Sequence, residues 1–445
     1  MRSCDVVIIG AGVSGLAAAR ELHERGLRVI LLEARTRIGG RIFTVRDSQS
    51  GMPIELGAEF LHGRAEEVSE ILEEAGLRAV DVNGGHWQAR PGSLHPVSDY
   101  WNQLEQVMQR LPRRPRHDYS FADFLREAPG GRRLARERRL ATQYVEGFHA
   151  ADPDLVSGTV LADAGSPGDD LRERRIGRVV DGYDGVVERL AQTVASRVRL
   201  GSIVEAVRWR EGHAEVDVRR SQSGRRSTIS ARALVVTVPV GVLKAAAGEP
   251  GAIAFTPDIA AKRDALAHVA MGSVVRLAFR LRDRFWADDS FAARGRGKNI
   301  DTLAFLHTAD RDFPTWWTAY PLSAPVIVAW CGGPRAGQLS TLGHRALENR
   351  AIASLAHQLG FTSRRMRSLV ERSWMHDWVS DPFSRGAYSY QLVGGIDAPA
   401  TLARPLKRTL FFAGEATDGE GATGTVHGAI ATGRRAAKQV LSALR

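Results

Sequence analysis

The stretch DVVIIGAGVSGLAAARELHERGLRVILLEARTRIGGRIFT, residues 5–44, decides the fold. Its first apolar run, Val6–Ile9, is typical of a fully buried strand. Gly10, Gly12 and Gly15 follow in the G-x-G-x-x-G spacing of dinucleotide-binding folds. The first glycine permits a tight turn, the second lets the backbone approach a pyrophosphate, and the third lets a helix pack closely on the strand.

The residues after these glycines complete a β-α-β unit. A helix over 15–25 would point its N-terminal N–H groups, together with Ser14, at the phosphates, because the helix dipole favours negative charge there. A second strand over 28–32 leads to Glu33, eighteen residues after Gly15, the spacing expected of a carboxylate that binds an adenosine ribose. Strand, glycines, helix, strand and acid in this order predict a dinucleotide-binding domain.

The next residues relate the chain to a known family. The sequence EARTRIGGR, residues 33–41, resembles the E-A-R-x-R-x-G-G-R stretch of flavin-containing amine oxidoreductases, the group of monoamine and polyamine oxidases. The resemblance implies FAD as the cofactor and assigns Arg35, Gly40 and Arg41 to its binding. Arg41, beside the second glycine turn, could contact the diphosphate from the opposite side. Arg37 fits a solvated loop charge equally well.

A second family segment follows at residues 54–63, IELGAEFLHG, which resembles L-G-A-x-W-I-H-G. His62 matches the histidine that faces the substrate cavity in animal polyamine oxidases, although a structural role is about as well supported. Glu59 is a carboxylate that could attract an ammonium group. The residues that the resemblance places against the flavin or the substrate are Gly57, Ala58, Glu59, Phe60 and His62.

Three later segments extend the same resemblance. Val204 matches the position whose backbone contacts the adenine, and LFFAGE, residues 410–415, resembles the F-A-G-E-x-T step that meets the second ribose or the phosphates. The last helix would open near Thr425 and point its N-terminus at the flavin pyrimidine. Thr425 stands where monoamine oxidases carry the second aromatic of a substrate cage, so it would widen the site. These segments contribute Val204, Gly414, Glu415, Thr425 and Val426 to the expected cofactor contacts.

Residues 374–390 carry the second strong match, with Trp378, Asp381, Ser384, Gly386 and Tyr388 at the family positions. Trp378 is expected against the cofactor, and Tyr388 matches the first aromatic that holds the substrate amine. Ala387 occupies the position of the cysteine that bonds flavin covalently in monoamine oxidases. The resemblance therefore implies non-covalent FAD.

The strand MGSVVRLAF, residues 271–279, resembles the family's G-x-x-x-K strand, but Arg276 stands where the lysine is expected. In the family this lysine holds a water against flavin N5 and assists reaction with O2. The closest lysines in sequence are Lys262 and Lys298. Arginine keeps the charge but is larger, planar and effectively never deprotonated. An oxidase tuned differently and a dehydrogenase that uses another acceptor are both compatible.

The fold class that these segments imply is α/β, with a Rossmann-type FAD/NAD(P)-binding domain interleaved with an α+β substrate-binding domain, as in amine oxidases. Residues 1–63, 177–255 and 395–445 form the expected FAD-binding domain, which has a three-layer β-β-α arrangement. Residues 64–176 and 256–394 form the expected substrate-binding domain, whose first half has a helical pattern. The aromatic cluster PTWWTAYP, residues 314–321, suits core packing or a wall that binds an ammonium group.

Composition narrows the class of protein. With 445 residues and 44% hydrophobic content, the chain can bury two cores. Cys4 and Cys331 offer neither a disulfide scaffold nor a metal cluster, which favours a reducing cytoplasm. The first strand begins within five residues of the N-terminus, and no run of eighteen apolar residues occurs, so we expect no leader and no membrane span.

The net charge of +11 comes almost entirely from arginine, since only five lysines occur. The densest runs, residues 110–116 and 132–139, lack interleaved aromatics and read as solvated faces rather than as a nucleic-acid site. We therefore expect no nucleic acid as a partner. A homodimer stays open.

The reaction implied by the resemblance is hydride transfer from the carbon next to a neutral amine nitrogen to flavin N5. Imine hydrolysis and reoxidation by O2, giving H2O2, would follow. No strong catalytic base is visible, which suits this chemistry because the protein mainly positions and desolvates the amine. The sequence favours a mono- or polyamine substrate. The alternatives are an L-amino-acid oxidase in which Arg276 pairs a carboxylate, a flavin dehydrogenase with another acceptor, and a non-catalytic flavoprotein.

Overall fold

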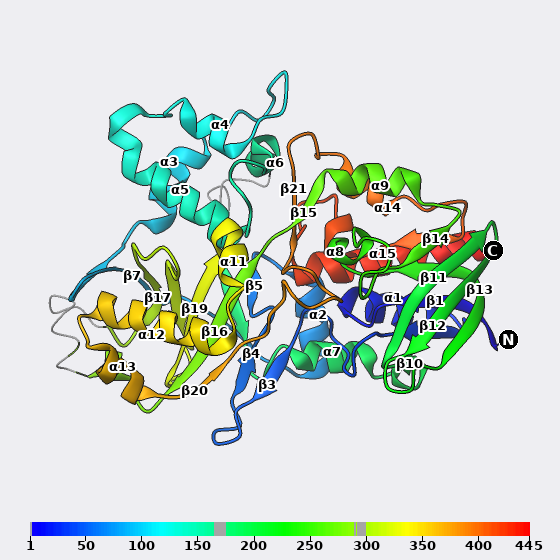
Figure 1. Cartoon of the computed structure of the whole chain (residues 1–445), viewed down its shortest axis with the longest axis horizontal. Coiled ribbons are helices and arrows are strands. Elements are labelled where there is room, and N and C mark those ends of the chain that lie inside the picture. Colours follow the sequence, from blue (N-terminus) through cyan, green and yellow to red (C-terminus); the bar gives the residue numbers. More distant parts are fainter. Residues whose placement is uncertain (1, 164–174, 289–290, 292–299) are drawn as a thin grey trace.

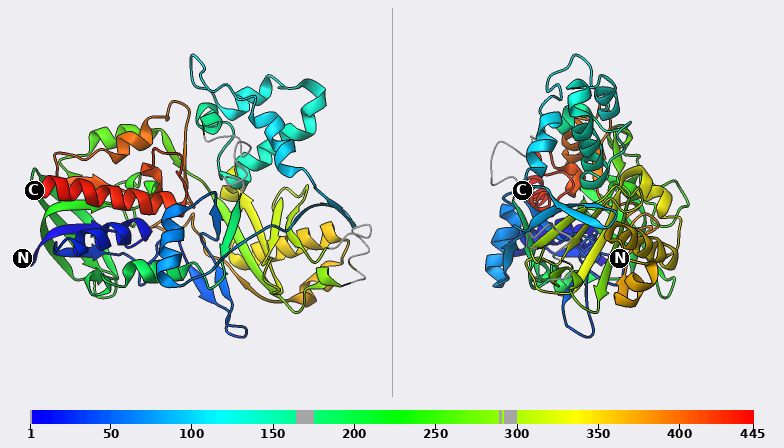
Figure 2. Two further views of the ribbon diagram at one scale, coloured as in Figure 1. Left: turned by 180° about the vertical axis from the view of Figure 1, so that it is seen from behind. Right: turned by 90° about the vertical axis from the view of Figure 1, so that its left-hand side faces the viewer.

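The computed structural model describes residues 2–163, 175–288, 291 and 300–445, which form two β-sheet lobes and a helical lobe (Figure 1). Both termini lie in the first lobe, which is built on an eight-stranded sheet (Figure 2). Its parallel strands are β10 (Val198–Arg199), β2 (Val29–Leu32), β1 (Arg2–Ile9), β13 (Arg226–Val236) and β22 (Leu410–Phe412). The long β13 also pairs antiparallel with β12 (His213–Arg220), beyond which lie β11 (Ser202–Arg210) and β14 (Ala254–Thr256).

Alternate residues of β1 face two different cores. Val6 and Ile8 pack among the helices α1 (Val13–Glu24), α7 (Asp184–Ala191) and α15 (Val426–Leu444). Val7 and Ile9 pack against the β11–β12 hairpin. The parallel strands therefore lie between a helical layer and a β layer, so the expected three-layer arrangement and the α/β fold class are confirmed.

Helix α2 (Glu66–Ala75) has Glu66 and Glu67 in its first turn and ends at Gly76, whose φ is +64°. It buries Val68, Ile71 and Leu72 in the same core as α1 and α15. A small sheet beside it joins β5 (Phe60–His62), β9 (Ile176–Val179) and β6 (Ala79–Asp81). The segment 66–81 thus packs with the predicted FAD-binding segments, although the predicted boundary at residue 64 assigns it to the substrate-binding domain.

The second lobe contains a seven-stranded sheet, on the left of Figure 1. Its order is β20 (Val370–Trp374), β16 (Val274–Leu281), β19 (Val326–Gly332), β18 (Thr315–Thr318), β17 (Leu303–His307), β7 (Gly85–Arg90) and β8 (Ser93–Pro96). Leu277 and Phe279 of β16 pack in one core with α11 (Gly333–Leu339) and α12 (His344–Leu359). The alternation of a strand turns Arg276 to the opposite face, toward the centre of the molecule.

Helices α3 (Tyr100–Met108), α4 (Phe121–Arg126), α5 (Ala135–Phe148) and α6 (Gly158–Asp163) form the helical lobe at the top of Figure 1. A 3-10 turn, Gly131–Leu134, leads directly into α5. Above the first lobe in Figure 1, α9 (Ala260–Ala267) and α14 (Ala398–Ala403) pack beside a two-stranded ribbon of β15 (Val269–Met271) and β21 (Ser389–Gln391).

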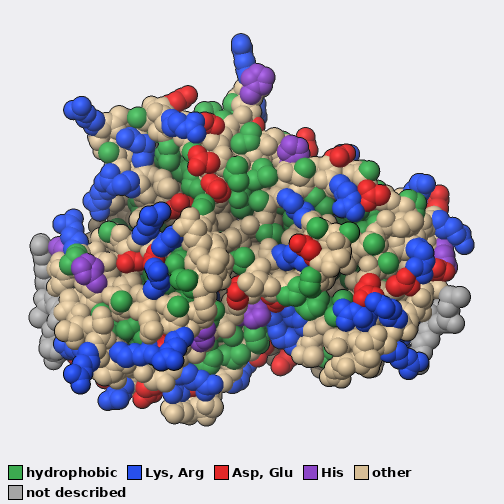
Figure 3. Space-filling view, in the orientation of Figure 1, with side chains coloured by type: hydrophobic (Ala, Val, Ile, Leu, Met, Phe, Trp, Pro, Cys, Tyr) green, Lys and Arg blue, Asp and Glu red, His purple; other side chains and the backbone are tan. Residues whose placement is uncertain are grey.

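The distribution of surface charge and the state of the two cysteines can be compared with what the composition predicts. Basic side chains are scattered among acidic ones over the face in Figure 3 and do not gather in one patch there. Cys4 and Cys331 are buried and free. Within the described residues, no helix combines the length and hydropathy needed to cross a bilayer, and no three potential ligands lie together around a metal site. The cytoplasmic location stays a prediction.

Candidate active site

A cavity of about 1480 Å³ lies where the two sheets and the helical lobe meet. It exceeds the roughly 300–1,000 Å³ of a typical small-ligand pocket, so it has room for a dinucleotide and a second molecule. Every site residue predicted from the sequence lines this cavity except Gly15. Gly15 instead lies where α1 meets β1, and a Cβ there would be 2.0 Å from the Gly10 carbonyl oxygen, which supports its predicted packing role.

One end of the cavity is a glycine cradle at the start of α1. Gly10 has φ +103°, and Gly12 and Gly40 approach so closely that a Cβ on Gly40 would lie 3.1 Å from the Gly12 Cα. No side chain caps the N-terminus of α1. The Ser14 hydroxyl is buried and has no hydrogen-bond partner among the described residues. These free donors and the open backbone suit a phosphate group.

The predicted ribose carboxylate lies next to this cradle. Glu33 accepts hydrogen bonds from the backbone N–H groups of Ala11 and Arg35, both at 2.9 Å, which holds it at the cavity wall. Arg35 turns to Asp381, with Nη2 2.8 Å from the carboxylate. Burial alone would raise the pKa of Asp381, but a hydrogen bond from His376 and the Arg35 charge hold it well below its usual range. Arg35 thus joins the first motif to the segment containing Trp378.

Arg41, predicted at the diphosphate, and Glu415, predicted at the second ribose or the phosphates, meet in the fold. Arg41 Nη1 lies 2.8 Å from Glu415 Oε1 and 2.9 Å from the Ala387 carbonyl oxygen. Glu415 Oε2 accepts from the Ser389 hydroxyl at 2.6 Å and from Gly424 N–H at 3.1 Å. The sequence pointed to Arg41 and Glu415 separately. Ser389 gave no signal beyond its place after Tyr388.

Gly57, Trp378 and Gly414 shape the backbone around Arg41 and Glu415. A Cβ on Gly57 would lie 1.9 Å from the Arg41 carbonyl oxygen, so no larger residue fits there. Trp378 Nε1 donates to the Leu56 carbonyl oxygen at 2.8 Å, which fixes the ring beside Gly57. Gly414 has φ +128° and leads from β22 to Glu415.

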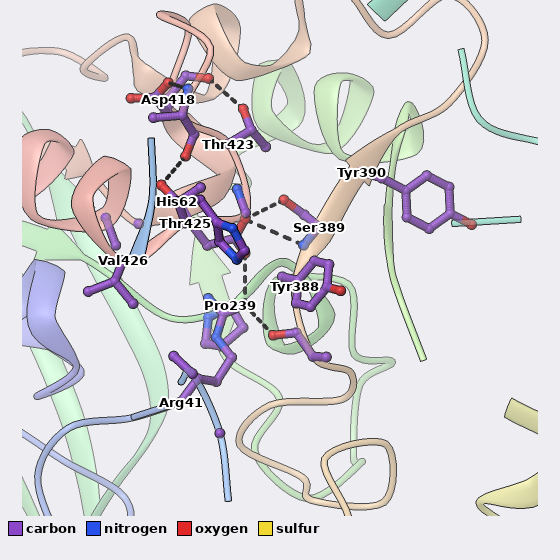
Figure 4. Close-up of a pocket in the computed structure, with 18 of the residues that line it drawn as sticks. Arg41, His62, Pro239, Tyr388, Ser389, Tyr390, Asp418, Thr423, Thr425 and Val426 are labelled. Carbon is purple, nitrogen blue, oxygen red and sulfur yellow. Dashed lines mark hydrogen bonds and ion pairs between the residues drawn. The ribbon is translucent and has the colours of Figure 1, made fainter. Parts of the chain in front are cut away.

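The residues expected at the substrate line the same cavity (Figure 4). Tyr388 donates its hydroxyl to the Phe148 carbonyl oxygen at 2.7 Å, which leaves its ring as the cavity surface. Thr425 caps α15, accepting from Gly428 N–H at 3.0 Å. Burial and the neighbouring His427 lower the pKa of His62 to about 4, so His62 is neutral near pH 7.

Glu59 and Arg276 depart most from expectation. Glu59 Oε2 pairs with Arg276 Nη2 and accepts from Trp317 Nε1 at 3.0 Å, while Oε1 lies 3.0 Å from Arg178 Nη1. The Glu59, Arg178 and Arg276 side chains are only 6%, 9% and 4% exposed. Glu59 is therefore already neutralised, so the expectation that it attracts an ammonium group is not supported. Glu59 likewise engages Arg276 through Nη2, whereas Arg276 Nε and Nη1 are buried and have no hydrogen-bond partner among the described residues.

Lys262 does not replace the family lysine. Its ammonium donates to the carbonyl oxygens of Thr401, Leu402 and Arg404 at the end of α14, outside the cavity lining. Lys298 lies outside the described residues. Trp316 packs in the core behind the sheet, as predicted, whereas Trp317 lines the cavity, where binding of an ammonium group stays a prediction.

Several cavity residues were not predicted from the sequence. They are Arg178, which binds Glu59, and the rings of His86, Tyr100, Trp101 and His307. Arg178 lies on β9, opposite Phe60 of β5. The four rings stand in no quoted motif, and they meet through the pairing of β17 with β7 and the packing of α3.

Comparison with known proteins supplies the family. A family model described as flavin containing amine oxidoreductase matches residues 13–441. The chain belongs to this family and is a flavin-dependent amine oxidoreductase, which confirms the resemblance first seen at residues 33–41.

Individual relatives agree. Polyamine oxidase 3 of Oryza sativa subsp. japonica is 29% identical, over 98% of this chain and 88% of that protein. Among solved structures, putrescine oxidase bound to putrescine has a TM-score of 0.79 at 21% identity, and cyclohexylamine oxidase from Brevibacterium oxydans IH-35A has 0.78 at 20%. Each structure is covered over 99% of both chains, so the fold is shared throughout.

Proposed function

We propose that this chain binds FAD non-covalently in the central cavity and uses it to oxidise the C–N bond of an amine. The observation that carries the proposal is the continuity of one cavity from the glycine cradle, past Arg41 and Glu415, to His62 and Tyr388. A dinucleotide laid along this path would bring its phosphates to the cradle and its ring to the aromatic end.

The residues present fit such a cofactor. The uncapped N-terminus of α1 and the Ser14 hydroxyl would receive the diphosphate, and Glu33 would bind the adenosine ribose. Arg41 supplies positive charge, which Glu415 holds in place. The N-terminus of α15 lies at Thr425, where its dipole can stabilise negative charge on a reduced flavin.

Non-covalent binding is supported by the cysteines. Ala387 lines the cavity where monoamine oxidases carry the bonding cysteine, and Cys4 and Cys331 are buried outside the lining. We expect acid or heat denaturation of the purified yellow protein to release all the flavin, which should match FAD on chromatography with the protein-free supernatant. Flavin that stays with the precipitated protein would contradict non-covalent binding, and release of FMN would contradict the dinucleotide.

When bound, FAD would supply a hydride acceptor for the carbon next to the amine nitrogen. That carbon loses the hydride while the nitrogen lone pair forms the C=N bond, so the nitrogen must be unprotonated. Neutral His62 and the Tyr388 ring add no charge that would hold an ammonium ion in place. Water then hydrolyses the imine, and the two electrons leave to O2, giving H2O2, or to another acceptor.

An L-amino-acid oxidase is the less favoured candidate. Glu59 engages one nitrogen each of Arg276 and Arg178, but Arg276 Nε and Nη1 are buried without a partner among the described residues, so the preference for an amine rests on the relatives. The names of the relatives include polyamine, putrescine and cyclohexylamine oxidases, so amines with charged and with apolar tails both occur among them.

A further inference from the structure

Seven rings form a closed circuit of contacts inside the cavity, which we call the aromatic belt. Its members, in the order in which they touch, are Phe60, His62, Phe148, Tyr144, Trp101, His86 and Phe305. The centroids of successive rings lie 4.8–6.4 Å apart, and the last ring, Phe305, returns to Phe60 at 5.8 Å. All seven side chains line the cavity.

The belt combines elements that are far apart in the chain. Phe60 and His62 come from β5, His86 from β7, Trp101 from α3, Tyr144 and Phe148 from α5, and Phe305 from β17. Phe148 also accepts the Tyr388 hydroxyl through its backbone. The belt therefore begins beside the residues expected to hold the reacting nitrogen and extends away from them into the second lobe.

A second layer of rings keeps the far side of the belt uncharged. His86 Nδ1 and His307 Nε2 lie 3.1 Å apart, and Tyr100 stacks on both imidazoles, with centroids at 5.1 and 4.6 Å. Burial lowers the pKa of His86 to about 4, and burial together with His86 lowers that of His307 to about 3. Both imidazoles are neutral at the pH of the cell.

The ionic groups beside the belt repel a cation rather than attract one. Trp317, which contacts Phe60 at 5.5 Å, donates to Glu59. Glu59 faces two arginines, Arg178 and Arg276, and Glu55 interacts with all three. Burial raises the pKa of Glu55 to about 7, so while Glu55 is protonated this cluster carries one positive charge in excess. No member of the belt is acidic, and the acidic side chains that line other parts of the cavity, such as Glu67 and Asp418, stand outside the belt. The tail of an amine that lies along the belt would therefore meet aromatic surface without a carboxylate partner in the belt.

We propose that the aromatic belt selects amines whose non-reacting end is uncharged and apolar, and that it discriminates against diamines and polyamines. The inference rests on the proposed function and names its substrate class. An ammonium over aromatic rings gains a cation–π attraction, but losing its hydration without a carboxylate partner costs more than such contacts return. An apolar tail gains free energy from the same burial.

The test compares two amines that differ only at the far end, hexylamine and 1,6-diaminohexane. Each is mixed anaerobically with the FAD-loaded protein in a stopped-flow instrument, and the limiting rate of flavin bleaching and the apparent Kd are measured. We expect the ratio of rate to Kd to be about 100-fold higher for hexylamine, with most of the difference in Kd. Equal ratios, or a higher ratio for the diamine, would overturn the inference while supporting amine oxidation. Bleaching by neither amine would overturn the inference, and the proposed function would fall with it only if a panel of other amines also left the flavin oxidised.

A variant in the aromatic belt tests whether the belt causes the preference for hexylamine over 1,6-diaminohexane. Trp101 is half-buried at the edge of the core of the helical lobe, and Trp101→Glu adds a carboxylate to the belt. It should reduce the preference for hexylamine at least tenfold. His95→Ala is the control, because His95 lies on the neighbouring strand β8 but does not line the cavity. It should keep the wild-type preference. An unchanged preference in Trp101→Glu that binds FAD normally would mean that the tail lies elsewhere.

Discussion

Gly12→Ala should fold as the wild type does and bind FAD about 100-fold more weakly, a loss of about 2.7 kcal/mol. Gly12 has φ −71°, which alanine adopts freely, and a Cβ there would find no protein atom closer than 3.9 Å. The protein itself therefore tolerates the methyl group. A bound pyrophosphate does not, because it needs the backbone of Gly12 within contact distance. Titration of apoprotein with FAD, followed by flavin fluorescence, measures the change.

Gly343→Ala is the matched control. Gly343 also precedes a helix, with φ −70°, and also has open space around its Cα, but it lies at the exposed start of α12 outside the cavity. Both variants carry the same small cost of alanine at an N-cap. FAD affinity should fall only in Gly12→Ala. Equal affinity in the two variants would show that the diphosphate does not bind at this turn.

Glu59→Gln should lower the free energy of unfolding by about 3–5 kcal/mol, because it leaves two buried guanidinium groups without a counter-charge. Burial already lowers the pKa of Arg178, and Glu59 opposes that shift. Glutamine keeps the shape of glutamate and can still accept one hydrogen bond from Trp317, so the effect isolates the charge. Urea unfolding followed by circular dichroism measures it.

Two comparison variants complete this experiment. Asp258→Asn breaks an exposed pair with Arg263, whose side chains are 51% and 49% exposed, and should cost less than about 1 kcal/mol. Arg276→Lys keeps a cation opposite Glu59 and should cost less than Glu59→Gln. If Glu59→Gln destabilised the protein no more than Asp258→Asn, the buried cluster would not have the energetic role that its geometry indicates.

The cofactor half of the site could be predicted because its determinants are local. Gly10, Gly12 and Gly15 lie within one turn, and their spacing alone fixes the strand, the turn and the helix that follow. Arg41 and Glu415 are 374 residues apart, yet each stands in its own motif. Both residues could therefore be assigned to the cofactor site separately, and the family fold brings them together as an ion pair.

The substrate half could not be predicted in the same way, because its contacts are non-local. Arg276 was read against the family lysine, but its partner Glu59 is 217 residues away and faces it only because β5 and β16 border one cavity. Trp317 reaches the same carboxylate across 258 residues. His86 and His307 stand in no motif, and the register of β7 on β17 brings them together. Side-chain pairing of this kind follows from tertiary packing.

The most direct test of amine oxidation is to mix the purified yellow protein with hexylamine without oxygen, follow the absorbance of the oxidised flavin, and then admit air. We predict that the flavin bleaches and that its colour returns in air with formation of H2O2. Bleaching followed by no return in air would retain amine oxidation but assign the electrons to another acceptor. Flavin that stays oxidised with hexylamine and with a panel of other mono-, di- and polyamines would contradict the assignment of this cavity to amine oxidation.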